Sequence, residues 1–113
     1  MQSLPNYLRS KRKQFSLTQE EVAFLLGLKG MDRGGKVSRD ENFSRMPTLE
    51  TALAYEAMYG IPIRELFAGL YEQVAKEVFS RAKILSYRKN ETPHPKKQQF
   101  LSVLAAHNYK PVS

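Results

Sequence analysis

The sequence predicts an all-α fold, and three observations lead to this prediction. Apolar residues recur at helical spacing in one segment after another, as Val22, Leu25 and Leu26 do. Residues that begin and end helices, such as Thr18 and Gly27, flank these segments. The connections between the first five segments are short, as expected for a compact helical domain of about 65–70 residues.

Two helices are expected at the start of the chain. The first covers Leu4–Lys13, where Pro5 suits the first helical turn. The second covers Thr18–Leu26. The Thr18 side chain can cap this helix, and Glu21, three residues later, can reach back to complete a capping box.

The third helix is expected to follow an irregular loop. Residues 28–35 form this loop and include three glycines. The third helix is then expected over Gly35–Phe43. Pro47 prevents its continuation, because the residue before a proline avoids the helical region.

Two further helices are expected next. Leu49–Tyr59 has few polar residues, which predicts a largely buried helix. Thr48 can cap it and Gly60 can stop it. A short helix is expected over Ile63–Phe67, with its apolar side chains facing inward.

The rest of the chain is expected to extend this domain with two helices. An amphipathic helix, longer than those before it, covers Leu70–Lys89. A linker rich in helix breakers follows, and Lys96–His107 forms a final helix within a basic tail. We therefore divide the chain into residues 1–69, 70–90 and 91–113.

The long helix carries an apolar stripe that is wider than a closed domain needs. An exposed stripe of this kind usually marks an interface, so we expect a homodimer. The alternative is that the helix folds back on the first and fifth helices of its own chain, covered by Phe100, Leu101 and Leu104. The stripe consists of Leu70, Val74, Val78, Ala82 and Leu85.

Charge is distributed unevenly along the chain, which has a net charge of +7. Residues 1–45 hold nine basic and five acidic side chains, residues 46–80 two and five, and residues 81–113 seven and one. A basic start and a basic end favour a polyanionic partner at one or both ends, with solvated surface charge as the alternative.

The residue types argue against an enzyme and against a membrane protein. The chain has no cysteine, so disulfides and thiolate metal sites are excluded. His94 and His107 have no further ligand at metal-binding spacing and belong to no recognisable catalytic triad. No apolar run approaches the length of a membrane span. We expect a soluble cytoplasmic protein without a cofactor, a metal or catalytic residues.

Five segments match a known family in order and spacing. They are Thr18-Gln19-Glu20-Glu21-Val22-Ala23, Leu26-Gly27, Val37-Ser38-Arg39 with Glu41, residues 47–53, and Gly60-Ile61-Pro62-Ile63 with Glu65-Leu66-Phe67. Over residues 4–69 the chain thereby resembles the Xre/Cro-type helix-turn-helix domain of phage repressors and many bacterial regulators. The resemblance implies a five-helix, phage-repressor-like DNA-binding domain whose third helix enters the major groove.

The sequence departs from the family between the second and third helices. The loop from Gly27 to Val37 is longer than the family's usual tight turn. Gly34 and Gly35 also stand where many members place polar, base-reading side chains. Because of this departure, the resemblance does not define where the third helix begins or how its N-terminus contacts DNA.

The third helix and its surroundings are expected to contact DNA. Arg39 can donate two parallel hydrogen bonds to guanine O6 and N7, with a phosphate contact or a solvated charge as the alternatives. Asn42 and Arg45 are expected at the DNA backbone. Lys29 and Arg33, in the loop, either clamp phosphates or are solvated. The expected DNA-binding set around this helix is Lys29, Arg33, Gly35, Lys36, Ser38, Arg39, Asn42 and Arg45.

Two further roles follow from the resemblance alone. The family uses a glutamine at the position of Gln19 to bind a DNA phosphate and to brace the third helix. It also has an arginine and a glutamate, at the positions of Arg12 and Glu41, that form a partly buried ion pair between the first and third helices. The alternative for all three residues is an ordinary place on the surface.

Together these expectations favour a sequence-specific, double-stranded-DNA-binding transcriptional regulator, in the form of a dimeric repressor. The alternative is an antitoxin-like or other protein-interaction module, whose basic C-terminal segment binds a small protein partner. RNA binding is disfavoured, because the major groove of an A-form helix is too narrow for a reading helix.

Overall fold

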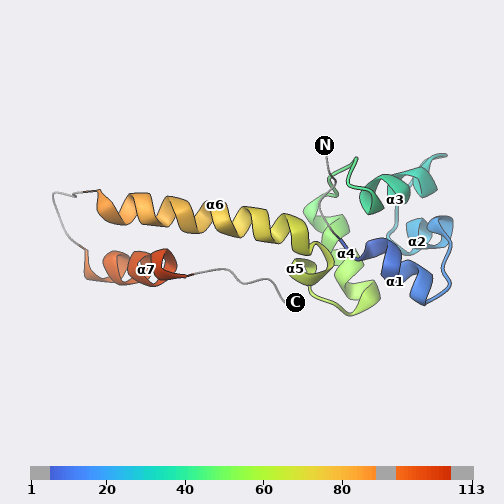
Figure 1. Ribbon diagram of the computed structural model, residues 1–113. Coiled ribbons are helices and arrows are strands. Elements are labelled where there is room, and N and C mark those ends of the chain that lie inside the picture. Colours follow the sequence, from blue (N-terminus) through green and yellow to red (C-terminus); the bar gives the residue numbers. More distant parts are fainter. Residues whose placement is uncertain (1–5, 89–93, 108–113) are drawn as a thin grey trace. The chain divides into compact units, whose positions relative to one another are not determined.

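A computed structural model describes residues 6–88 and 94–107, and this part of the chain is all-helical without a strand, which confirms the predicted fold class (Figure 1). The chain divides into two compact units, one ending at Leu70 and the other starting at Tyr71. No described helix is long and apolar enough to cross a membrane. The helices are α1 (Leu8–Gln14), α2 (Gln19–Leu25), α3 (Arg33–Glu41), α4 (Leu49–Tyr59), α5 (Ile63–Leu66), α6 (Ala68–Tyr87) and α7 (Pro95–Ala106).

The predicted ends of α2 and α4 are confirmed. Glu21 N donates to the Thr18 hydroxyl over 3.0 Å, and Thr18 N donates to the Glu21 carboxylate over 2.9 Å, which completes the capping box. Thr48 caps α4 by accepting a hydrogen bond from Thr51 N. Gly27 and Gly60 follow α2 and α4 with φ of 75° and 69°, the left-handed conformation that ends a helix.

The first helix begins later than expected, at Leu8. The Asn6 side chain accepts a hydrogen bond from Leu8 N over 3.0 Å, a turn closed by the side chain that sets the start of α1. Leu4 and Pro5, which were expected in this helix, lie outside the described residues.

The third helix is displaced toward the N-terminus relative to the expected Gly35–Phe43. α3 begins at Arg33, takes Gly34 and Gly35 of the expected loop into its first turn, and ends at Glu41. Asn42 then accepts a hydrogen bond from Ser44 N over 3.0 Å, and Phe43 has a φ of 63°, so the chain leaves the helix there.

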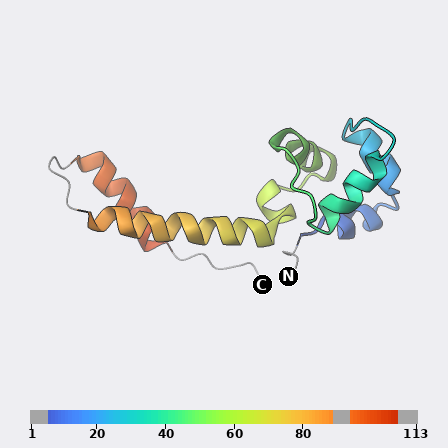
Figure 2. The ribbon, with the colours of Figure 1, turned by 90° about the horizontal axis from the view of Figure 1, so that it is seen from above.

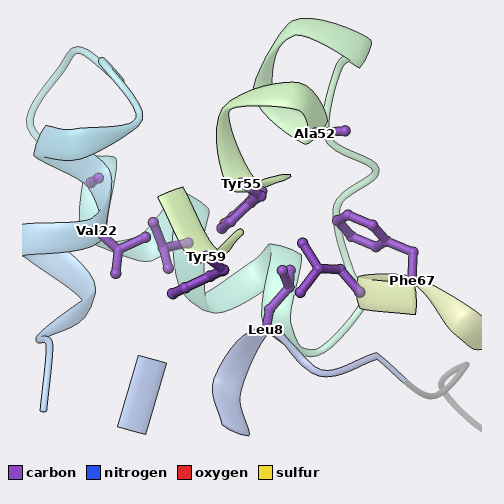
Figure 3. Packing of buried hydrophobic residues seen from close by; sticks show 9 residues of the cluster. Leu8, Val22, Ala52, Tyr55, Tyr59 and Phe67 are labelled. Atoms are coloured by element: carbon purple, nitrogen blue, oxygen red, sulfur yellow. The ribbon is translucent and has the colours of Figure 1, made fainter. Parts of the chain in front are cut away.

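The core of the first unit lies among α1 to α5 (Figure 3). Tyr55 lies at its centre, with ring centroids 6.2 Å from those of both Tyr59 and Phe67. α4 is less buried than predicted, because its side chains Leu49 and Leu53 are exposed. The buried cluster consists of Leu8, Val22, Ala23, Val37, Ala52, Tyr55, Tyr59, Leu66 and Phe67.

The second unit contains most of α6 together with α7, which lies beside it (Figures 1 and 2). Ala75 and Ala82 of α6 and Leu101 of α7 are buried. The rings of Phe79 and His107 also meet, with centroids 4.3 Å apart. These contacts give α6 one face that is covered within the unit.

The expected dimer stripe on α6 is therefore narrower than predicted. Ala82 is buried within its own unit, and Leu70 packs against the core of the first unit. Leu85 is half-buried. Val74 and Val78 remain 46% and 41% exposed and form the free part of the stripe.

Candidate nucleic-acid interface

The outward face of α3 is defined by the residues that the helix buries. Val37 and Asp40 are fully buried and anchor α3 in the core of the first unit. With 3.6 residues per turn, the opposite side of the helix carries Gly35, Ser38 and Arg39. This side ends at Asn42, the C-cap residue, whose side-chain oxygen is occupied by Ser44. Arg39 is thus the one long, charged donor on the face that was expected to read bases.

Arg33 and Arg39, two of the three arginines expected to contact DNA, each have an exposed carboxylate partner. Arg39 Nη2 lies 3.0 Å from Asp32 Oδ2, and the Arg33 side chain pairs with Glu20 of α2. All four side chains are at least one-third exposed, so each pair lies at the surface. No role at this surface was predicted for Asp32 or Glu20.

The two glycines of α3 make room for these carboxylates. A Cβ atom at Gly35 would lie only 2.2 Å from Asp32 Oδ1, and one at Gly34 would lie 3.0 Å from Glu20 Oε2. Any larger residue at Gly35 would displace the Asp32 carboxylate. A pair of glycines at the start of the predicted third helix was the available signal, because glycine in a helix costs roughly 1 kcal/mol relative to alanine.

The expected lysines border this surface. Lys36 Nζ donates to the backbone oxygen of Lys29 over 3.2 Å, which ties the side of α3 to the loop before it. The Lys29 side chain is exposed. Together they place two positive charges beside the outward face of α3.

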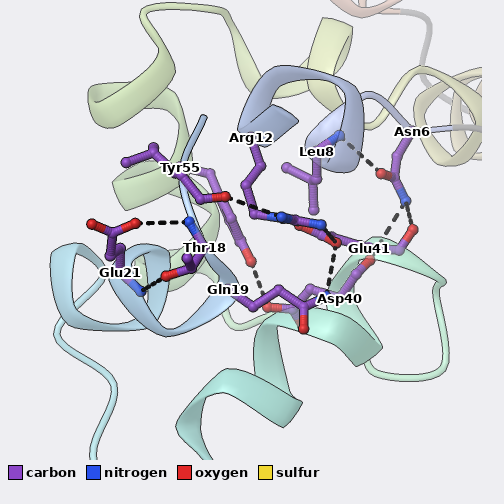
Figure 4. Close-up of polar contacts among 10 residues, drawn as sticks. Asn6, Leu8, Arg12, Thr18, Gln19, Glu21, Asp40, Glu41 and Tyr55 are labelled. Carbon is purple, nitrogen blue, oxygen red and sulfur yellow. Dashed lines mark hydrogen bonds and ion pairs between the residues drawn. The ribbon is translucent and has the colours of Figure 1, made fainter. Parts of the chain in front are cut away.

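Arg12, Gln19 and Glu41 form one network between α1, α2 and α3 (Figure 4). Arg12 donates from Nε and Nη2 to the two Glu41 oxygens over 2.7 and 3.2 Å, and from Nη1 to Leu17 O over 3.0 Å. Gln19 Nε2 donates to Glu41 over 3.3 Å. The hydrogen bond and charge of Glu41 raise the pKa of Arg12 against the opposing effect of burial. The structure thus pairs Arg12 with Glu41, as the family resemblance implied, and brings Gln19 to the same carboxylate.

Arg45 points toward the core rather than toward a free surface. Its Nε lies 3.4 Å from Oδ1 of the buried Asp40, and its Nη1 is buried without a hydrogen bond. Asp40 Oδ2 accepts from the Tyr55 hydroxyl over 2.9 Å, as Figure 4 shows. Burial raises the pKa of Asp40, while Tyr55 and the nearby arginines act in the opposite direction. Arg45, which was expected at the DNA backbone, thus also makes a structural ion pair with Asp40 at the end of α3.

No cluster of three potential metal-ligating side chains occurs in residues 6–88 and 94–107. No family model, curated protein or solved structure matches this chain. The resemblance to Xre/Cro-type domains therefore stays a prediction from the sequence, and the geometry of α3 carries the functional argument.

Proposed function

We propose that the first unit binds double-stranded DNA in a sequence-specific way and that the protein is a transcriptional regulator, acting as a repressor. The observation that carries this proposal is the outward face of α3. It presents Arg39 from a helix that α1 and α2 hold by the Arg12–Glu41–Gln19 network. A side chain on a rigidly supported helix is well suited to reading bases.

The neighbouring charges support a groove-binding role for this face. Arg39 supplies the base contact and Ser38 a contact to a base or a phosphate. Lys29, Arg33 and Lys36 lie beside it and supply phosphate contacts, which position a protein on DNA without reading its sequence. Gln19 braces α3 through its hydrogen bond to Glu41.

The direct test is selection of bound duplexes from a random pool, followed by mobility-shift titration of the selected site. Arg39→Ala is expected to weaken binding to the best site by roughly 1–3 kcal/mol and to relax the preference at one base pair, because one bidentate contact is lost. The readout is the affinity for the selected duplex and for its single-base variants.

Arg64→Ala is the matched control, because Arg64 is an exposed arginine of α5 in the same unit. It removes the same charge and is expected to leave base preference unchanged. An Arg39→Ala protein that behaves like Arg64→Ala on every duplex would contradict the placement of α3 in the groove.

We also propose that the protein dimerises through the exposed part of the α6 stripe. One short reading helix contacts only a few base pairs, and a dimer doubles the site, with half-sites about 34 Å apart or a multiple of it. Val78→Glu places a charge in this surface and is expected to give a folded monomer that binds DNA weakly. Sedimentation velocity at micromolar concentrations measures the change.

Ser80→Glu is the control for the dimer prediction. Ser80 is exposed on α6 and lies two residues from Val78, which places it toward the opposite side of the helix. It should leave the dimer intact. A wild-type protein that is monomeric both free and on DNA would disprove the dimer.

A further inference from the structure

Asp32 occupies the N-cap position of α3 but does not cap the helix. Its side chain makes no hydrogen bond to the backbone of the first turn. Instead its carboxylate lies along the outside of the helix and pairs with Arg39 Nη2 at 3.0 Å. Asp32 is 70% and Arg39 43% exposed at the side chain, so the pair lies on the surface that the proposed function assigns to DNA.

Helix geometry brings these two residues together although seven positions separate them. Side chains of a helix lean toward its N-terminus, so Arg39 extends back along α3 toward Asp32. Gly35 lies between them, and all three terminal atoms of the Asp32 carboxyl group lie 2.2–2.9 Å from where its Cβ would be. The Asp32 carboxylate therefore occupies the space that a side chain at residue 35 would fill.

We propose that Asp32 is a positioning residue that sets the sequence specificity of Arg39, an inference that rests on the proposed function. Asp32 Oδ2 engages only Nη2, which leaves other guanidinium donors for guanine O6 and N7. The carboxylate restricts the conformations of Arg39 before DNA arrives, so less ordering is needed for a correctly placed contact.

The charge of Asp32 acts in the same direction. A carboxylate beside Arg39 offsets its attraction for phosphates, which is the part of DNA binding that does not depend on sequence. It therefore lowers affinity for unrelated DNA more than affinity for a site where Arg39 reaches a base. Loss of this carboxylate frees Arg39 to follow the phosphate backbone.

The test compares wild type with Asp32→Asn on the selected duplex and on a scrambled duplex, over a series of salt concentrations. The variant is expected to bind the scrambled duplex more tightly, and the ratio of the two affinities should fall about two- to fivefold, the range that an exposed charge pair can contribute. The salt dependence on the scrambled duplex should steepen by about one phosphate contact.

Glu20→Gln provides a matched control. It removes another exposed carboxylate, here from the neighbouring arginine, Arg33, which has no assigned base contact. It should raise affinity for both duplexes alike and leave their ratio unchanged. An equal fall of the ratio in Glu20→Gln and Asp32→Asn would show a general charge effect and overturn the proposal.

The Arg39→Ala background separates positioning from a merely structural role. There Asp32→Asn is expected to change the affinity ratio no further, because Asp32 acts through Arg39. Two outcomes overturn this inference alone. In one, Asp32→Asn leaves the ratio of affinities for the selected and scrambled duplexes unchanged in the wild-type background. In the other, Asp32→Asn still lowers this ratio in the Arg39→Ala background. Wild-type protein that binds no duplex, or binds all duplexes equally, overturns the proposed function and this inference with it.

Discussion

Glu41→Ala is expected to lower the free energy of unfolding by roughly 3–5 kcal/mol, because it leaves the Arg12 guanidinium without its charged partner in a largely buried place. The Glu41 and Arg12 side chains are only 5% and 13% exposed. Glu41 also accepts from Gln19, so the substitution removes the acceptor of three hydrogen bonds at once. Thermal unfolding should shift down by more than about 10 °C.

Two comparisons make this result specific to the network. Glu77→Ala removes an exposed glutamate of α6 whose partner, Arg81, is 4.0 Å away, and it should change stability by less than about 1 kcal/mol. A double-mutant cycle with Arg12→Ala should show strong coupling. Simple additivity of Arg12→Ala and Glu41→Ala would mean that the pair contributes nothing beyond two independent side chains.

The sequence alone was sufficient to predict the structural features that depend on local chemistry. The caps at Thr18 and Thr48 and the stops at Gly27 and Gly60 depend on side chains and backbone within one turn, and all four are confirmed. The helical class followed for the same reason, since hydrophobic spacing is a local property of each segment.

Features that depend on partners distant in the sequence were missed. Three glycines in residues 28–35 suggested a loop, but α3 already begins at Arg33, and Asp32 and Glu20 lie close against the two glycines of its first turn. Asp40 had no role predicted from the sequence, yet Tyr55 and Arg45 contact it in the core. No periodicity in one segment reports such contacts between segments.

The stripe on α6 shows a related limit of sequence analysis. Spacing placed Val74, Val78 and Ala82 on one side of a helix, as the structure does. Spacing does not say what covers that side. Ala82 is buried in its own unit while Val74 and Val78 are exposed, so a single stripe divides into a covered and a free part.

Tyr55→Ala is expected to destabilise the first unit by roughly 3–5 kcal/mol, the cost of removing a buried aromatic ring from a packed core. Tyr55 has no exposed surface and contacts the rings of Tyr59 and Phe67. Tyr55→Phe keeps the ring and removes only the donor to Asp40, and should cost about 1–3 kcal/mol. Urea unfolding measures both, and equal losses would mean that the ring contributes little.

The cost of Tyr55→Phe is expected to depend on pH, because Tyr55 donates to Asp40 and favours its charged form. Burial raises the pKa of Asp40 in the folded protein. The contribution of Asp40 to the free energy of unfolding is therefore fully present below the ordinary aspartate pKa of about 3.9, and it is lost as the pH rises through the raised pKa of the folded protein. Burial and Asp40 raise the pKa of Tyr55 as well, so its hydroxyl stays a donor over this range. Removing that donor raises the Asp40 pKa further, so Tyr55→Phe should destabilise more at about pH 7 than at about pH 4. An equal loss of unfolding free energy at the two pH values would show that Asp40 does not change its charge between them.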